Sequence, residues 1–284
     1  MISFERARVG LVYRWRHGRW PALDRPQRFT EWVQWRKLND RNLDRARLTD
    51  KAHSKRAAAA ALGEDFVVPT LWEGATLPVV APWPLPFVVK ANHGCGQVVI
   101  VRSAADYSRA RRVTLRWLGR AYGGWLDEWH YRAARRSILV EPFIGMTETL
   151  PIDYKIYVFG GRARMVQVHE GRGGRHRWSQ YDRNWRQLSS TAATASAPHS
   201  LEAMLAAAER LGQGHDFVRV DLYEIDGAPL FGEFCLYPGS GLDPFDPPTL
   251  DDWLGAHWTA QQGELQAIVG SGVAASIELV PQLR

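Results

Sequence analysis

Cysteine is scarce in this chain of 284 residues, which has only Cys95 and Cys235, far apart in segments that look functional. This distribution argues against a disulfide framework and favours a reducing, cytoplasmic environment. Long apolar runs are also missing, because no stretch approaches the length of a signal-peptide core or a membrane-spanning helix. The sequence therefore predicts a globular protein that neither spans a membrane nor is secreted through such a signal.

Lysine is the second scarce residue. Of the 36 basic residues, 31 are Arg and only five are Lys: Lys37, Lys51, Lys55, Lys90 and Lys155. Against this background each Lys is a candidate for a specific role. The formal net charge of +6 attracts polyanions, which include nucleotides, acidic sugars, nucleic acid and anionic membranes, and it does not choose among them.

Basic and aromatic residues gather near the start of the chain, at Arg14, Trp15, Arg16, His17, Arg19 and Trp20. This combination suits the surface of an anionic membrane, so peripheral contact with the inner face of the membrane is one interpretation. A solvated helix face is the favoured alternative.

The spacing of apolar residues predicts an α+β protein. Helical spacing over residues 29–62 predicts two or three helices, and five prolines between Pro69 and Pro86 indicate a connector without regular structure. Further helices are predicted over residues 104–122 and 201–211, and the tail from residue 261 has helical spacing. Short β-branched runs predict strands of mixed sheets at residues 87–90, 97–102, 137–144, 153–159, 163–169, 217–223 and 229–236.

The first candidate site is a hairpin in which a strand ending at Lys90 is followed by Gly94, Cys95 and Gly96 and then by a second strand. Glycines let backbone N–H groups approach phosphate oxygens, and a Lys ammonium neutralises them, so this hairpin could cover a triphosphate. Its spacing differs from that of a Walker A loop. A plain tight turn is the competing interpretation, and Lys90 at the end of an apolar strand weighs against it.

A second pair of strands carries carboxylates on otherwise apolar runs. Arg219 and Asp221 fall on one face of the first strand, and Glu233 lies on its partner beyond an Asp-Gly turn. Paired carboxylates repel unless a cation separates them, and Mg²⁺ prefers oxygen ligands. The Pro-Gly-Ser-Gly turn that contains Ser240 favours a metal, because it offers backbone donors nearby. The alternative is a buried ion pair between Arg219 and either carboxylate.

A third candidate segment has Glu141 at the end of a strand, followed by a proline and Phe143. Such a strand end exposes backbone groups that suit the edge of an adenine ring, and Glu141 could accept the adenine amino group. On the next strand, Asp153 is placed for ribose hydroxyls, with Glu148 as a weaker candidate, and Lys155 projects from the same face toward phosphate. A salt bridge between Asp153 and Lys155 is an equally favoured alternative.

These segments occur in the order found in the ATP-grasp superfamily, namely a Lys before a Gly loop, Val-Glu-Pro-Phe-Ile, Asp-Tyr-Lys, Arg-Val-Asp, and Gly-Glu followed by Pro-Gly. More narrowly, the chain resembles the TupA-like ATP-grasp family, which is linked to teichuronopeptide and other cell-surface polysaccharide synthesis. The resemblance covers most of residues 26–255. It also includes Phe29–Trp35, Asp40–Asn42, Glu128–Tyr131 and the single residues Arg172, His176, Tyr181, Asp182 and Trp185.

The resemblance implies two α+β lobes that clasp ATP behind a short helical N-terminal region. The expected parts are an N-terminal region with the connector (1–85), a first lobe with the Gly-rich loop (86–140), a second lobe with the metal site (141–260) and a C-terminal tail (261–284).

The resemblance also assigns roles. It makes Lys90 and Lys155 phosphate ligands, Asp221 and Glu233 magnesium ligands, and Arg219 the group that faces the reacting centre. One position departs from the superfamily, which commonly has Asn two residues after the metal-binding Glu, where this chain has Cys235. A thiol is a poor Mg²⁺ ligand, so Cys235 is expected to fill space. Cys95 stands where Ser is common, and we do not expect it to be a nucleophile.

The implied reaction is an ATP- and Mg²⁺-dependent ligation of a carboxylate to an amine through an acylphosphate, with Lys90, Lys155 and Arg219 stabilising the developing charge. Arg binds carboxylates through two parallel hydrogen bonds. We therefore expect an acidic small molecule or saccharide, such as a uronic-acid sugar, to be held by the basic loop residues Arg172, Arg175, His176 and Arg177, with Ser240 as a further candidate. A mobile basic surface segment is the alternative for this loop.

Three other functions compete. A phosphotransferase acting on a sugar would keep the fold but would not consume an amine. A nucleic-acid-binding module is suggested by the Arg content and the 13 Trp, but most Trp fall at helical spacing that suits a core, so no nucleic-acid partner is expected. A non-catalytic scaffold is disfavoured by the presence of Lys90, Asp221 and Glu233.

Overall fold

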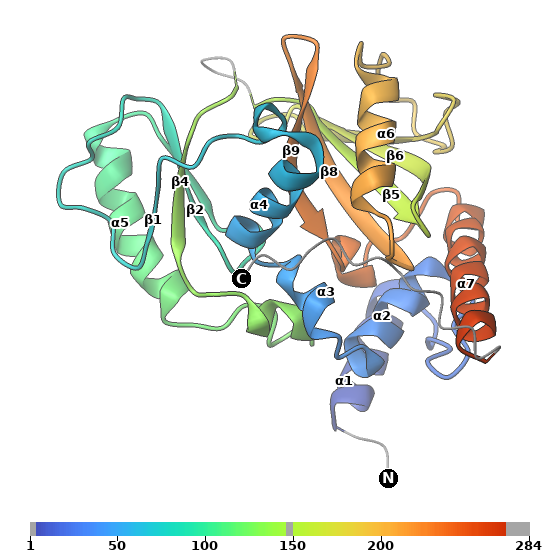
Figure 1. Cartoon of the computed structure of the whole chain (residues 1–284). Helices are drawn as coiled ribbons and strands as arrows, with labels where there is room; N and C mark the ends of the chain where they lie inside the picture. Colours follow the sequence, from blue (N-terminus) through green and yellow to red (C-terminus); the bar gives the residue numbers. More distant parts are fainter. Residues whose placement is uncertain (1–3, 146–149, 271–284) are drawn as a thin grey trace.

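The structure is a computed structural model that describes residues 4–145 and 150–270. These residues form two sheets with helices packed around them (Figure 1). The strand orders are β1-β4-β2-β3 and β7-β6-β5-β8-β9. Every pairing between these strands is antiparallel, so the expected mixed sheets are wrong. Several neighbours are consecutive strands joined by turns too short for a parallel crossover.

The smaller sheet and one helix make up the first lobe. The strands are β1 (Trp72–Gly74), β2 (Phe87–Ala91), β3 (Val98–Val101) and β4 (Ile138–Pro142), and the helix is α5 (Ala104–Leu118). Ser103 caps α5 by accepting a hydrogen bond from the Asp106 N–H, and Tyr107 and Ala110 of the helix pack on Phe87 and Val101. Strand β1 lies inside the predicted connector, which therefore contains one short element of regular structure.

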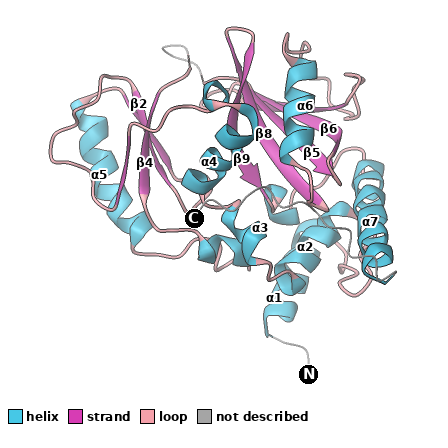
Figure 2. Ribbon diagram, viewed as in Figure 1, coloured by secondary structure: helices cyan, strands magenta, loops and turns pink. Residues whose placement is uncertain are grey.

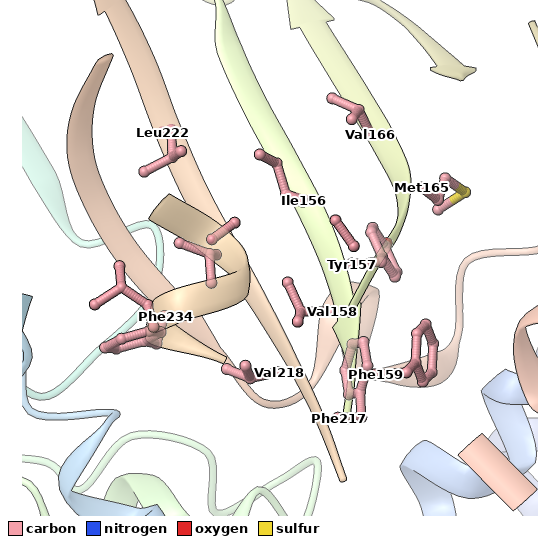
Figure 3. Packing of buried hydrophobic residues seen from close by; sticks show 14 of the residues in the cluster. Ile156, Tyr157, Val158, Phe159, Met165, Val166, Phe217, Val218, Leu222 and Phe234 are labelled. Atoms are coloured by element: carbon pink, nitrogen blue, oxygen red, sulfur yellow. The ribbon is translucent and has the colours of Figure 1, made fainter. Parts of the chain in front are cut away.

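The larger sheet forms the second lobe. Its strands are β5 (Asp153–Phe159), β6 (Arg162–Glu170), β7 (Arg177–Asp182), β8 (Phe217–Ile225) and β9 (Ala228–Cys235). Asp226 and Gly227 both have positive φ, as a two-residue hairpin turn requires, so the predicted turn is confirmed. Ile156 and Val158 of β5 point to one face, and Tyr157 and Phe159 point to the other (Figure 3). All four side chains are buried, so the sheet is covered on both faces.

Most of the remaining helices come from the two ends of the chain, and several of them pack on this sheet. They are α1 (Phe4–His17), α2 (Phe29–Asn39), α3 (Leu43–Arg47), α4 (Lys51–Leu62), α6 (Leu201–Leu211) and α7 (Thr249–Gly270), with short 3₁₀ turns η1 (Glu64–Phe66), η2 (Trp129–Ala133) and η3 (Pro238–Gly241). Phe29 of α2 and Trp258 of α7 pack on Phe159 and Phe217. The N-terminal helical region therefore shares the core of the second lobe. None of the described helices is long and apolar enough to cross a bilayer.

Helix α4 lies between the two sheets (Figure 2). The Lys51 N–H donates to the Asn92 carbonyl in the first lobe, and the helix packs on β9 in the second. Asp50 caps α4 at its start, and Gly63 ends it with positive φ. The expected boundary between residues 140 and 141 falls inside β4, and the expected tail begins inside α7, with residues 271–284 outside the described ones.

Candidate active site

The first half of the site is a buried carboxylate held between two lysines. Glu141 on β4 is the register partner of Val88, and its oxygens lie 2.6 Å from Lys55 Nζ and 2.5 Å from Lys90 Nζ. Burial alone would raise the pKa of Glu141, but the two ammonium groups outweigh it and lower that pKa. Glu141 was predicted to accept the adenine amino group. In this structure its carboxylate is ion-paired with Lys55 and Lys90.

A cavity of about 170 Å³ lies beside these lysines, between the lobes. Its apolar lining comes from both lobes and includes Val88, Ile100, Phe143 and Phe231. Lys55, Lys90, Glu141, Arg172 and Tyr223 supply its polar groups. A cavity with an apolar lining and a few polar groups suits an adenine ring. We call this cavity the nucleotide pocket.

The second half is a row of charged residues across three strands of the larger sheet. Register pairing sets Lys155 on β5 opposite Asp221 on β8, and Asp221 opposite Glu233 on β9. Lys155 Nζ lies 2.6 Å from Asp221 Oδ2 and 2.6 Å from Asp153 Oδ2. Arg219 donates two hydrogen bonds of 2.7 Å to Asp221. Both ion pairs that the sequence left as alternatives, Arg219–Asp221 and Asp153–Lys155, are therefore present.

Glu233 is neutralised from outside the sheet. Lys51 Nζ, at the start of α4, lies 2.5 Å from Glu233 Oε2. Burial opposes the charge on Glu233, but Lys51 outweighs burial and lowers the pKa of Glu233. Burial likewise opposes the charge on Lys155, while Asp221 and Asp153 raise its pKa. Glu233 and Lys155 therefore both stay charged at neutral pH.

The donor set fits a magnesium ion that takes part of its coordination from elsewhere. Asp221 and Glu233 present hard oxygen donors from facing positions, and Asp153 Oδ1 is buried without a hydrogen-bond partner. Among the described residues, no group of three or more His, Cys, Asp or Glu could hold a metal ion. Burial raises the pKa of the Cys235 thiol to about 12, so it stays protonated and cannot replace a third ligand.

A second cavity of about 240 Å³ is lined in part by Arg219. Its lining is polar and aromatic and includes Arg16, Gln167, His169, His176, Trp178 and Gln180. His169 Nδ1 and His176 Nε2 lie 3.0 Å apart. Burial, and then Lys155 and Arg219, lower the pKa of His169 to about 3, which keeps that ring neutral. We call this cavity the acceptor pocket.

The sequence as a whole matches one protein family. Residues 31–259 match the family described as TupA-like ATPgrasp. The chain belongs to this TupA-like ATP-grasp family. The match covers most of the chain, and it confirms the predicted family, the α+β ATP-grasp fold and the class of ATP-dependent ligases.

Several solved structures resemble this TupA-like ATP-grasp protein more distantly. A D-alanine–D-alanine ligase from Bacillus anthracis, complexed with ATP, shares 16% identity over 81% of this chain and 70% of that chain, with a TM-score of 0.49. An L-amino acid ligase from Bacillus licheniformis shares 17% identity over 70% and 43% of the two chains, with a TM-score of 0.44. At these scores the resemblance carries no functional argument. No curated protein matches the chain.

The predicted site residues fall into separate parts of the ATP-grasp site. Phe143 lines the nucleotide pocket, and Gly94, Cys95 and Gly96 lie in the loop between β2 and β3, where Gly96 has a φ of 70°. Asp153 is buried at the start of β5. Glu148, the weaker ribose candidate, lies outside the described residues.

Five residues were predicted to hold the acidic substrate, and three of them, Arg175, His176 and Arg177, line one hollow beside the acceptor pocket. His176 lines the acceptor pocket, whereas Arg172 lines the nucleotide pocket and lies 3.0 Å from Asp153. Arg177 is at the exposed start of β7 and lines an adjoining hollow. Ser240 is buried, and its hydroxyl lies 2.8 Å from Lys37 Nζ. Arg172 and Ser240 therefore lie apart from the other three predicted residues.

Two functional residues were not predicted, Lys51 and Lys55 of α4. Both contact carboxylates of the ATP-grasp site, Glu233 and Glu141 respectively. Their helix lies between the segment Asp40–Asn42 and the Lys90 hairpin, outside every quoted motif, so motif order gave no reason to include them. The scarcity of Lys was the available signal.

Proposed function

We propose that this protein is a carboxylate–amine ligase that forms an acylphosphate from ATP. The supporting observation is the position of Arg219. This residue lines the acceptor pocket, and it also donates two hydrogen bonds to Asp221 in the charged row. One residue thus joins the place where an acidic substrate would lie to the charged row that would meet the phosphates. Positioning and charge stabilisation are the main requirements of phosphoryl transfer.

In the proposed reaction, adenine occupies the nucleotide pocket and Lys90 and Lys155 contact the phosphates. Arg219 holds the substrate carboxylate, whose oxygen attacks the γ-phosphorus as the bond to the β-phosphate oxygen breaks and ADP leaves. An amine then attacks the acylphosphate carbonyl, phosphate leaves, and the nitrogen loses a proton to give the amide. Arg219 and Lys155 neutralise charge during the first step.

Asp221 and Glu233 would hold the magnesium ion, with Lys51 displaced from Glu233. When bound, the ion would neutralise charge on the phosphate oxygens. Two protein carboxylates suffice because Mg²⁺ usually keeps several water and phosphate ligands.

The acceptor is proposed to be an acidic small molecule or saccharide, and the pathway to be cell-surface polysaccharide synthesis or modification in the cytoplasm. The exposed Trp178 ring beside Arg219 and Arg16 supports this assignment, because a flat aromatic face and cations together suit an acidic sugar. Family membership supports the pathway.

The test is phosphate release by purified protein with ATP, Mg²⁺, uronic-acid sugars and a panel of amino acids as amines. The ligase predicts phosphate release that requires both an acid and an amine. ADP formation without any amine, with phosphate transferred to a sugar, would instead support the phosphotransferase alternative.

Two variants test the charged row in the same assay. Asp221→Asn and Glu233→Gln should each lower the turnover rate by about a thousandfold or more. A cooperative unfolding transition of each variant would show that the fold is kept. Asp226→Asn, at the tip of the same β8–β9 hairpin, is the matched control and should retain activity. Full activity in both site variants would remove the proposed metal ligands.

A further inference from the structure

Helix α1 carries an apolar stripe on the face that points away from the protein. Phe4, Leu11 and Trp15 are 79%, 59% and 82% exposed, and their spacing places them on one side of the helix. The opposite side of α1 is the one that packs, through Val9 and Tyr13. Trp20, just after the helix, is 56% exposed. The outer side of α1 is thus unusually apolar for a solvated surface.

Positive charge is interleaved with this stripe. Residues 4–25 contain six Arg against one Glu and one Asp. The Arg8 guanidinium lies over the Phe4 ring, 5.5 Å from its centre, and that of Arg14 lies over the Trp20 ring at 5.2 Å. Arg8 is also ion-paired with Asp127, whereas Arg14 makes no ion pair among the described residues and leaves a cation beside an exposed ring. Arginines beside exposed aromatic rings are typical of helices that lie in the interface of an anionic membrane.

An open groove of about 640 Å³ runs between α1 and the segment that follows it. Leu11, Trp20 and Leu23 contribute apolar walls, and Arg6 and Arg25 lie at the same groove. Trp20 packs closely on the helix, since a Cβ added at Gly10 would lie 3.3 Å from its ring. The groove combines apolar walls with nearby cations, which matches the junction between acyl chain and anionic headgroup.

We propose that the outer face of α1, together with residues Trp20–Arg25, binds the surface of a membrane rich in anionic lipids. This inference is independent of the proposed reaction. Helix α1 lies at the lower edge of the molecule, where a flat surface can reach it (Figure 1). Its far end reaches the active site, because Arg16 lines the acceptor pocket and donates to the Leu242 carbonyl at 2.9 Å. Bound in this way, the protein holds its acceptor pocket next to the lipid headgroups.

Cosedimentation of the full chain with vesicles tests the proposal. Vesicles of phosphatidylglycerol and phosphatidylcholine should bind the protein. Raising the salt concentration from low to physiological should weaken this binding. The affinity for vesicles of pure phosphatidylcholine should be at least about tenfold lower. The double variant Leu11→Ser/Trp15→Ser should lose about tenfold or more in affinity for the anionic vesicles. Arg14→Gln/Arg25→Gln should lose a similar amount together with part of the salt dependence.

Matched control variants show whether vesicle binding is specific to this surface. Val79→Ser/Val80→Ser removes two residues that are 76% and 77% exposed on the first lobe, and Arg112→Gln/Arg116→Gln removes two exposed arginines of α5. Both controls should bind anionic vesicles like the unmodified protein. The proposal is overturned if no vesicle binds, if the controls lose as much as the α1 variants, or if Leu11→Ser/Trp15→Ser instead dissociates a dimer, which would assign the stripe to a second copy of the chain.

Discussion

At the scale of single residues, the few lysines explain how the site is assembled. All five have a polar partner within 3 Å that belongs to the site or to the turn below it: Lys37 with Ser240, Lys51 with Glu233, Lys55 and Lys90 with Glu141, and Lys155 with Asp153 and Asp221. A Lys ammonium is a compact point charge with three rotatable donors, whereas Arg presents a planar fork. The scarce lysines therefore supply compact charges around the candidate site, where Arg219 supplies the fork.

In the proposed metal site, Lys51 holds the position that a divalent ion would take on Glu233. Lys51→Met should lower the free energy of unfolding without metal by about 1.5–3 kcal/mol, because Glu233 loses its charged partner. The same change should make Mn²⁺ bind more tightly in the absence of nucleotide, because no ammonium competes for Glu233 Oε2. Thermal unfolding with increasing Mn²⁺ measures both effects.

The control for this experiment lies one helical turn further on. Lys55→Met removes the same kind of charge from α4, but Lys55 pairs with Glu141 and not with Glu233. It should destabilise the protein and leave the response to Mn²⁺ unchanged. Equal Mn²⁺ responses in the two variants would argue against competition at Glu233.

At the scale of elements, the loop between β2 and β3 depends on one glycine. Gly96 has a φ of 70°, which an L side chain adopts at a cost of about 1–2 kcal/mol, although a Cβ there would have open space. Gly96→Ala should therefore shift the loop away from its phosphate-covering shape and weaken binding of ADP with Mg²⁺ by about five- to tenfold. Calorimetric titration measures this.

Gly214→Ala is the matched substitution. Gly214 has a φ of 76° and equally open space, and it lies in the turn before β8. It should cost similar stability without changing nucleotide affinity. If both variants lose the same affinity, the loop of Gly96 has no specific role in nucleotide binding.

The sequence predicted those elements whose periodicity is strong. Helix α6 appears at the predicted bounds, and the strands that carry Lys90, Lys155 and Asp221 were all found, because alternation and β-branched content mark buried strands. Strands β1 and β7 were missed. β1 has three residues among prolines, and β7 begins at the exposed Arg177 after a Gly-rich loop, so neither shows an apolar pattern. Both lie at sheet edges, where one neighbour is enough to form a strand.

At the scale of the whole molecule, order along the chain predicted the fold but not the contacts between distant segments. The charged row on β5, β8 and β9 follows from strand alternation and hairpin register, which are local. The contribution of α4 does not, because Lys51 and Glu233 are 182 positions apart and meet only once α4 lies between the lobes. Long-range packing fixes such pairs, and no spacing within the sequence encodes them.

Asp216 ties the two ends of the chain to the second lobe. Arg36 Nη2 of α2 and Arg45 Nη2 of α3 lie 2.6 and 3.1 Å from its Oδ1, while Trp258 and Gln262 of α7 donate to Oδ2. Burial alone would raise the pKa of Asp216, but Arg36 and Arg45 outweigh it and lower that pKa. Asp216→Asn leaves buried Arg36 with only the more distant Asp40, 3.7 Å from its Nε, as a charged partner, so it should cost about 3–5 kcal/mol at pH 7.

The same lowered pKa sets the sign of a pH dependence. Because Asp216 titrates lower in the folded state than its unfolded value of about 3.9, its contribution to stability is complete above that pH and is lost as the pH falls toward the folded value. Urea unfolding measures the difference in the free energy of unfolding between the unmodified protein and Asp216→Asn. This difference should become smaller as the pH drops from 7 to 3. Asp24→Asn, which removes a carboxylate with an 84% exposed side chain, should show a small difference at every pH. If this difference for Asp216→Asn stays constant down to pH 3, the charge of Asp216 does not contribute to the stability of the network.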